Sequence, residues 1–215
     1  MKITWQNQID RTFELDGTEK LFLDAFCSKK EFSHKSWDDK DPSLVSIKSK
    51  IYKILRRIQR CRCAYCGLLK ISEKFDIEHF LPKRYYPKLM FSPYNLVLAC
   101  KRCNRDLKFM NNPLPVRTSD GSKALKGLIF GKFKYKFWHP YFHEASKHFK
   151  YSGKYNHHII GISPEGKEAV RIFELDRQES ISERILNASG SEALKAENMK
   201  RKNKIISSVL AFRSK

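Results

Sequence analysis

The chain has 215 residues, of which 41% are hydrophobic and 13% aromatic, so it can bury a core in one or two domains and is too apolar for wholesale disorder. Its 43 Lys and Arg residues outnumber 23 Asp and Glu residues, and the formal net charge of +20 favours a polyanionic partner. The longest uncharged run, Leu89 to Cys100, has 12 residues. A membrane span needs ~20 apolar residues, and the start of the chain has no apolar secretory core. We therefore expect a cytoplasmic protein without a membrane segment, in which six cysteines favour a metal site over disulfides.

Two helices are predicted in the N-terminal part. The first is expected to be capped by Thr18 and to run to about Cys27. From Ser43 to Ile58, apolar residues recur in steps of three and four, which is typical of an amphipathic helix. Lys and Arg residues occupy its other sides.

A compact block rich in motifs follows, from Cys61 to about Asn112. We expect strands over DIEHF (76–80) and NLVLAC (95–100), and a short helix near Asn104 to Phe109.

The last part of the chain is predicted to mix strands and helices. Three runs favour β structure, at 128–138, 156–163 and 169–176. The tail predicts two helices, at 177–188 and 191–212.

Positive charge is concentrated around the central block. The 61 residues from Lys48 to Lys108 carry 16 Lys and Arg residues and 4 acids, a net charge of +12. Such residues can neutralise phosphates, which gives affinity and position without sequence specificity. A solvated basic surface without a ligand is the alternative interpretation.

Two C-x2-C pairs lie in the same block, Cys63 with Cys66 and Cys100 with Cys103. Each pair can present two thiolates to one tetrahedral ion, and four sulfurs suit zinc. Because such a site has no open position, we expect the ion to be structural. Cys61 could replace a ligand, although its spacing is less suitable.

The segment between the two pairs contains Asp76-Ile77-Glu78-His79. In a strand, Asp76 and Glu78 share one face and His79 lies on the other. A joint role for Glu78 and His79 therefore requires a bend or a strand end at His79, which is consistent with Pro82 shortly after it.

The order C-x2-C, Glu-His-x-x-Pro, Asn-Leu and C-x2-C-Asn-x-x-x-Lys resembles the zinc-containing branch of the HNH endonucleases, whose core is a ββα-metal finger. EHFLPK, YNLVLACKRCN, WHPYFHEASKHFKYSG and IFELDRQESISERI are similar to segments of the HNH nucleases of Septu and retron anti-phage defence systems. The core resemblance covers about fifty residues, and the match over 130–185 is looser.

The resemblance implies a role for each matching residue. His79 corresponds to the general base that takes a proton from the attacking water, and Glu78 to the ligand of a catalytic divalent metal. Asn95 corresponds to the middle Asn, which braces the loop and orients the histidine. Asn104 replaces the final His of the signature and favours Mg²⁺ or Mn²⁺. Asp76 remains either a further ligand or a residue of the strand surface.

The substrate contacts expected in the basic block are Lys83, Arg105 and Lys108, the last of which is one helical turn beyond Asn104. His139 and His143 are expected to make structural hydrogen bonds, because Pro140 interrupts a helical ligand pair.

The expected fold is α+β, with a treble-clef-like ββα-metal core and two zinc knuckles between flanking helices and a small β-rich extension. The expected division is an N-terminal helical segment at 1–60, the nuclease core at 61–112, and the β-rich extension with C-terminal helices at 113–215.

The resemblance implies a metal-dependent endonuclease that cleaves DNA in anti-phage defence with an ATPase partner. No G-x-x-x-x-G-K-[ST] loop occurs in the chain, so an ATPase of that kind would be a separate subunit. An RNA nuclease, for instance acting on tRNA, and a zinc-knuckle module that binds nucleic acid without cleavage remain the alternatives.

Overall fold

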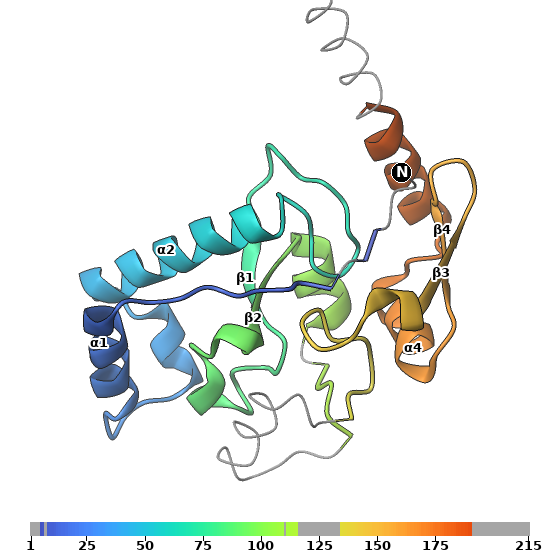
Figure 1. Cartoon of the computed structure of the whole chain (residues 1–215). Coiled ribbons are helices and arrows are strands. Elements are labelled where there is room, and N and C mark those ends of the chain that lie inside the picture. The colour runs from blue at the N-terminus through green and yellow to red at the C-terminus, as the bar shows by residue number, and fades with distance from the viewer. Residues whose placement is uncertain (1–4, 7, 110, 116–133, 191–215) are drawn as a thin grey trace, which may run out of the picture.

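The computed structural model describes residues 5–6, 8–109, 111–115 and 134–190, as a mixed α+β structure with two small sheets (Figure 1). The predicted helix at 191–212 and the part of the β-favouring run before 134 lie outside the described residues. Among the described residues, no helix has the length and apolar character needed to cross a bilayer. The labelled elements are α1 (Gly17–Cys27), η1 (His34–Asp38), α2 (Pro42–Ile58), β1 (Asp76–His79), η2 (Pro87–Leu89), η3 (Pro93–Asn95), β2 (Leu96–Ala99), η4 (Arg102–Lys108), η5 (Ala145–Lys147), β3 (Phe149–Ser152), β4 (His158–Gly161) and α4 (Pro164–Phe173). A further helix runs over 178–190.

The N-cap of helix α1 lies two residues earlier than predicted. Asp16, not Thr18, is the N-cap, because its carboxylate accepts from the backbone N–H of Glu19 at 3.0 Å. The Glu19 carboxylate in turn accepts from the Asp16 N–H at 2.9 Å, which completes a capping box. The Thr18 hydroxyl only donates to Asp16.

Helix α2 confirms the amphipathic pattern, and its apolar side is buried against the core. Asp41 caps it and Pro42 occupies its first turn. At its other end, Gln59 joins the helix to β2: its side-chain NH₂ donates to Leu98 O at 2.9 Å and its Oε1 accepts from Leu98 N at 2.7 Å. The basic helix is thereby held against the central strands.

The two predicted central strands are confirmed. β1 and β2 pair antiparallel, with Asp76 opposite Ala99 and His79 opposite Leu96. All four residues of β2 are buried. The helix predicted after them is a π-helix, η4, in which the N–H of Phe109 donates to Asn104 O at 2.9 Å. Short π segments are frequent at functional sites.

The C-terminal part forms the β3–β4 hairpin with α4 packed beside it. β4 falls within the β-favouring run at 156–163, but the prediction of β structure at 169–176 is wrong, because α4 includes 169–173 and a turn follows. Ser163 caps α4 by accepting from Gly166 N at 3.0 Å, and Pro164 begins it. Capping and helical spacing of the buried apolar residues outweigh the β-branched composition of this run. No strand forms over 134–138.

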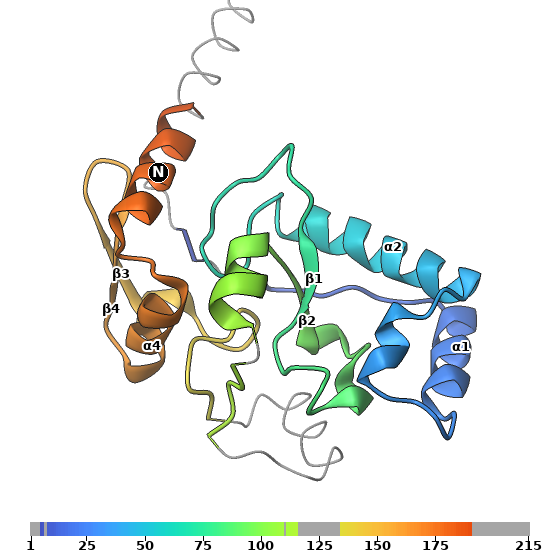
Figure 2. The ribbon, with the colours of Figure 1, turned by 180° about the vertical axis from the view of Figure 1, so that it is seen from behind.

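Polar contacts tie the C-terminal part to the central block. Arg102, the first residue of η4, pairs with Glu174 and donates to the Ser180 hydroxyl at 3.1 Å. Asn187 accepts from Leu69 N at 2.8 Å. Figure 2 shows η4 between the β1–β2 sheet and the C-terminal elements. One buried apolar cluster extends through all these parts.

Candidate active site and metal centre

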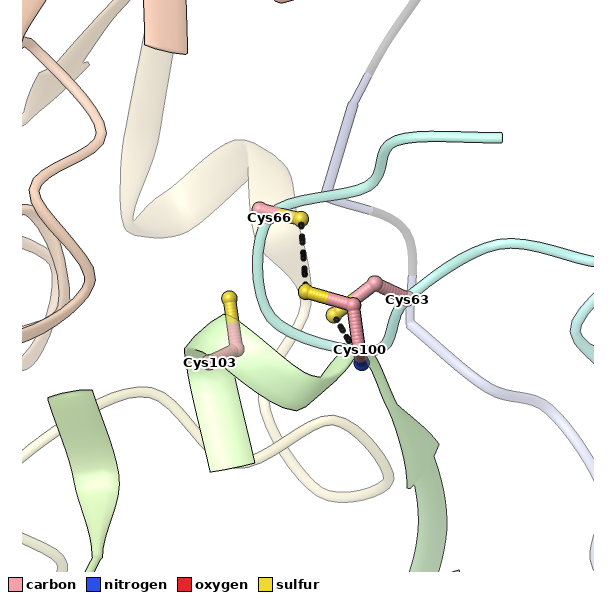
Figure 3. A group of neighbouring side chains, drawn as sticks. All are labelled: Cys63, Cys66, Cys100 and Cys103. Atoms are coloured by element: carbon pink, nitrogen blue, oxygen red, sulfur yellow. Dashed lines mark hydrogen bonds between the residues drawn. The ribbon is translucent and has the colours of Figure 1, made fainter. Parts of the chain in front are cut away.

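The four predicted metal ligands, Cys63, Cys66, Cys100 and Cys103, come together in the structure (Figure 3). All four are buried, and their sulfur atoms lie within 4.8 Å of one another. Cys66 Sγ and Cys100 Sγ are 3.9 Å apart. Thiolates bound tetrahedrally to zinc at about 2.3 Å have sulfurs about 3.8 Å apart. The quartet therefore fits a tetrahedral ion and could bind a metal such as zinc, and Cys61 does not belong to it.

The first knuckle depends on one glycine. Gly67 has φ +74° and lies against the backbone of Trp5, where an added Cβ would come within 2.1 Å of a carbonyl oxygen. Its N–H donates to Cys63 O at 3.0 Å and closes the turn between the first two cysteines. Only glycine satisfies both requirements. The second knuckle follows β2 directly, and the Cys100 N–H donates to Cys63 Sγ at 3.4 Å.

A cleft of about 770 Å³ lies beside the quartet's second knuckle, between α2, β1 and η4. Among the described residues, six lysines and arginines line the cleft against three acids. Glu78, His79 and Asn104 all contribute to its lining. The predicted catalytic residues other than Asn95 thus share one basic cleft, into which a phosphate chain would be attracted.

Two side-chain pairs connect β1 to η4 across the cleft. Asp76 and Glu78 lie on one face of β1, two residues apart. Asn104 and Lys108 are four residues apart on η4. Asn104 donates to Asp76 at 3.0 Å, and Lys108 pairs with Glu78 at 2.6 Å. We call this arrangement the β1–η4 ladder. Sequence spacing alone did not indicate it.

Glu78 forms the inner rung of the β1–η4 ladder. Its Oε1 accepts from the Tyr65 hydroxyl at 3.3 Å and lies 2.6 Å from the Lys108 ammonium. Burial raises the pKa of the Glu78 carboxyl, and the charge of Lys108 opposes this effect. The carboxylate also accepts a backbone hydrogen bond from His79, and its contacts with the side chains of Tyr65 and Lys108 are both made by Oε1.

His79 is the last residue of β1, and a bend follows at Phe80. The strand end required for a joint role with Glu78 is therefore present. The Nε2 atom of His79 lies 3.1 Å from Met90 O, and since a carbonyl only accepts, Nε2 carries the proton. The indole of Trp37 packs against the imidazole, with ring centroids 4.5 Å apart and an interplanar angle of 83°. Burial, followed by the charges of Lys83 and Lys108, lowers the pKa of His79 to about 3.

Asn95 is fully buried and holds the loop between the strands. Its Oδ1 accepts from Leu81 N at 2.7 Å, and its NH₂ donates to Leu81 O and Leu89 O at 3.2 and 3.0 Å. Leu89 precedes Met90, whose carbonyl accepts from His79. Asn95 therefore positions the acceptor of the His79 proton.

The three predicted substrate contacts all line the cleft but differ in exposure. The Arg105 side chain is 60% exposed and pairs with Asp76, and that of Lys83 is 29% exposed and lies 3.8 Å from Asp38. Lys108 is only 1% exposed, and besides Glu78 it contacts His79 O at 3.1 Å. Its ammonium is thus buried between these two partners.

Sequence reasoning leaves the role of Asp76 open between ligand and surface residue, on the basis of its alternation with Glu78, and it misses two further contributors to this site. Trp37 and Lys48 come from the N-terminal part, where no motif pointed to them; Lys48 donates to Trp37 O at 2.7 Å and lines the cleft. Contacts so distant in sequence leave no local pattern.

His139 and His143 lie outside the cleft and make structural hydrogen bonds, as expected. His139 is fully buried, and its Nδ1 accepts from Tyr141 N at 3.1 Å. His143 Nδ1 accepts from His139 N at 3.1 Å.

Comparison with known proteins finds similarity to two Septu proteins. It is 24% identical over 174 residues to the Septu protein PtuB of Bacillus mycoides (strain KBAB4), which covers 74% of this chain and 58% of that protein. It is 47% identical over 45 residues to the Septu protein PtuB of Bacillus thuringiensis, which covers 20% of this chain and 18% of that protein.

A third similarity, 42% identity over 43 residues, is to protein ea31 of Escherichia phage lambda and covers 20% of this chain and 14% of that protein. The chain therefore spans little more than half the length of the first of these relatives. No protein-family model and no solved structure matches the chain significantly. The chain is therefore similar to two Septu proteins PtuB, over most of its length in one case and over a short segment in the other.

Proposed function

We propose that the chain is a metal-dependent HNH endonuclease that hydrolyses phosphodiester bonds in DNA as an effector of prokaryotic anti-phage defence. The observation that carries the proposal is the meeting of His79 and the β1–η4 ladder in one basic cleft. A zinc-knuckle module that only binds nucleic acid would not need a buried imidazole and a carboxylate beside an amide at the same place.

His79 is the general base of the proposed reaction. With Nε2 donating to Met90 O, the lone pair of the neutral ring is on Nδ1. Among the described residues, Nδ1 has no hydrogen-bond partner. It is also not one of the fully buried polar atoms that lack a partner, so it keeps some access to solvent. It can therefore accept a proton from a water molecule that attacks the phosphorus. Trp37 and Met90 hold the ring in this orientation.

The oxygen donors of the site fit a hard divalent cation. Glu78 makes its side-chain contacts through Oε1, and the NH₂ of Asn104 is engaged by Asp76, which leaves Asn104 Oδ1 for a ligand. Carboxylate and amide oxygens are the donors that Mg²⁺ and Mn²⁺ take in proteins. Bound there, such a cation would stabilise negative charge on the phosphate oxygens. Arg105 and Lys83 at the cleft edge would contact neighbouring phosphates.

The role in defence rests on the similarity to Septu proteins PtuB. We infer an ATPase subunit as the partner of the chain, because the resemblance to defence nucleases implies one and the sequence has no phosphate-binding loop of its own.

The test is a cleavage assay with two histidine variants. Zinc-loaded protein is incubated with labelled plasmid, single-stranded DNA or tRNA in Mg²⁺ or Mn²⁺, alone and with its ATPase partner. His79→Ala is expected to retain zinc and fold and to lose about 10²–10⁴-fold in cleavage rate. His158→Ala, a change at an exposed histidine on β4, serves as the matched control.

Each outcome separates the candidates. Cleavage of plasmid by the parent and by His158→Ala, but not by His79→Ala, supports the DNA endonuclease. Cleavage of tRNA alone would replace DNA with RNA as substrate. A gel shift with no cleavage in either metal, with the partner present, would favour a binding module, and equal rates for His79→Ala and the parent would rule out His79 as the base.

A further inference from the structure

The carboxylate of Asp76 is held by three N–H donors. Asn104 Nδ2 donates to Oδ2 at 3.0 Å, and Arg105 donates twice, from Nε to Oδ2 at 2.8 Å and from Nη2 to Oδ1 at 2.7 Å. The Asp76 side chain is 20% exposed at the cleft edge, so this hydrogen-bonded group faces the site without being fully open to water.

These contacts determine which end of the Asn104 amide faces Asp76. An ionised carboxylate only accepts hydrogen bonds, so the group that faces it must be the NH₂. All three neighbours of the Asp76 oxygens are N–H groups, so the carboxyl acts only as an acceptor toward Arg105 and Asn104. Asn104 Oδ1 is then turned away from Asp76 and accepts no hydrogen bond from the described residues.

We propose that Asp76 is a positioning residue of the active site: braced by Arg105, it orients the Asn104 amide so that Oδ1 is presented to a divalent cation together with Glu78. This inference rests on the proposed function, in which Asn104 is a cation ligand. It answers the question that the sequence left open about Asp76. Both carboxylate oxygens are already engaged by donors, so Asp76 acts through Asn104 and is not itself a ligand.

Binding of Mn²⁺ tests the inference without relying on cleavage. Free Mn²⁺ is followed by electron paramagnetic resonance while it is titrated into zinc-loaded protein. Loss of a residue that orients a metal ligand costs about 10–100-fold in metal affinity, and we expect Asp76→Asn to weaken Mn²⁺ binding by that factor. Asp106→Asn, which removes the same charge from an exposed neighbour on η4, is expected to bind like the parent.

A double-mutant cycle distinguishes positioning from a direct or purely electrostatic effect. If Asp76 acts through Asn104, adding Asp76→Asn to Asn104→Ala causes no further loss of affinity. If the two losses multiply, Asp76 acts on the cation independently, and the inference is wrong. Asp76→Ala gives a second variant, and zinc content and thermal melting verify that each protein is folded.

The possible failures can be told apart. If Asn104→Ala weakens Mn²⁺ binding and Asp76→Asn does not, the positioning role fails and the proposed cation site stands. If Asn104→Ala binds Mn²⁺ like the parent, or the parent binds none, both the positioning role and the proposed ligand role of Asn104 are overturned.

Discussion

The ammonium of Lys108 lies 2.6 Å from Oε1 of Glu78, and both side chains are almost completely shielded from water. A buried ion pair of this kind replaces the hydration of two charges with a single contact and a few hydrogen bonds. Here the pair also joins the end of η4 to β1, so it contributes both to the fold and to the position of a proposed metal ligand.

Removing the Lys108 charge should therefore destabilise the protein strongly. Lys108→Met leaves the Glu78 carboxylate buried and uncompensated, which costs about 3–5 kcal/mol. The free energy of unfolding, measured in urea on zinc-loaded protein, is the readout. The double variant Glu78→Gln/Lys108→Met removes both charges and is expected to recover much of the loss.

The control for this experiment is Lys88→Met, at an exposed lysine of η2, with an expected change of less than about 0.5 kcal/mol. If Lys108→Met unfolds at the same urea concentration as the parent, the ion pair does not stabilise the protein in solution.

Loss of one sulfur from the cysteine quartet should disrupt the region that carries the cleft. Cys66→Ser is expected to lose its bound metal, because three thiolates and a hydroxyl bind zinc far more weakly than four thiolates. Apparent free energies of structural zinc binding are about 10–16 kcal/mol, so a large fall in melting temperature should follow. Mass spectrometry of metal content and thermal melting, with and without chelator, provide the measurements.

Cys61→Ser is the matched control, since Cys61 lies near the quartet in sequence and outside it in space. It should retain the full metal content and melting temperature. Full metal content in Cys66→Ser would show that the quartet is not the metal site.

Trp37 should affect turnover more than substrate binding. Its indole contacts the His79 imidazole and stacks on Phe91 at 5.5 Å between ring centroids. Trp37→Leu removes the flat surface that fixes the ring, and a small misplacement of a catalytic group costs up to about 10²-fold in rate. We expect kcat to fall by about 10–100-fold with little change in KM for DNA.

Trp37→Phe keeps an aromatic surface and should restore most of the rate. A folded Trp37→Leu protein with the parental kcat would contradict this role, and a change in KM alone would assign Trp37 to substrate binding.

Stability should fall as the pH drops below neutrality. Burial, followed by the charge of His143, lowers the pKa of His139 well below its usual value, so the folded protein keeps this ring neutral. The unfolded chain takes up a proton at His139 near pH 6.5. Stability from this residue is therefore present above pH 6.5 and decreases below it by about 1.4 kcal/mol per pH unit.

Urea denaturation from pH 7.5 to 5 measures this slope, and His139→Asn isolates it. The Asn Oδ1 atom can replace Nδ1 as the acceptor for Tyr141 N, but it does not titrate. The variant should have a shallower slope than the parent, and parallel curves would assign the acid sensitivity to other groups.

Local patterns predicted much of the fold. The step of three and four in α2 and the spacing of the cysteine pairs each reflect a constraint within a few residues, and both are confirmed. The error at 169–176 is also local in origin, because Val170 and Ile172 favour strands while the cap at Ser163 lies outside that run. A window that included the cap would have indicated the helix.

The site was predictable only in part. The sequence identified the residues of the proposed chemistry, but the partners of those residues come from other elements. Trp37 contacts His79, which is 42 residues away in the sequence, and Asp76 contacts Asn104, which is 28 residues away. Such pairings depend on how η1, β1 and η4 pack together, and no spacing rule applies to them.

Element η4 carries both Cys103 of the quartet and the two side chains of the β1–η4 ladder, all within seven residues. The length of this segment is thus as important as its residue types. Inserting a single alanine after Cys103 would leave all four sulfurs free to meet, yet it would rotate Asn104 and Lys108 away from their carboxylates. The metal site could then form while the register between metal and cleft is lost, a defect that the two C-x2-C pairs alone do not reveal.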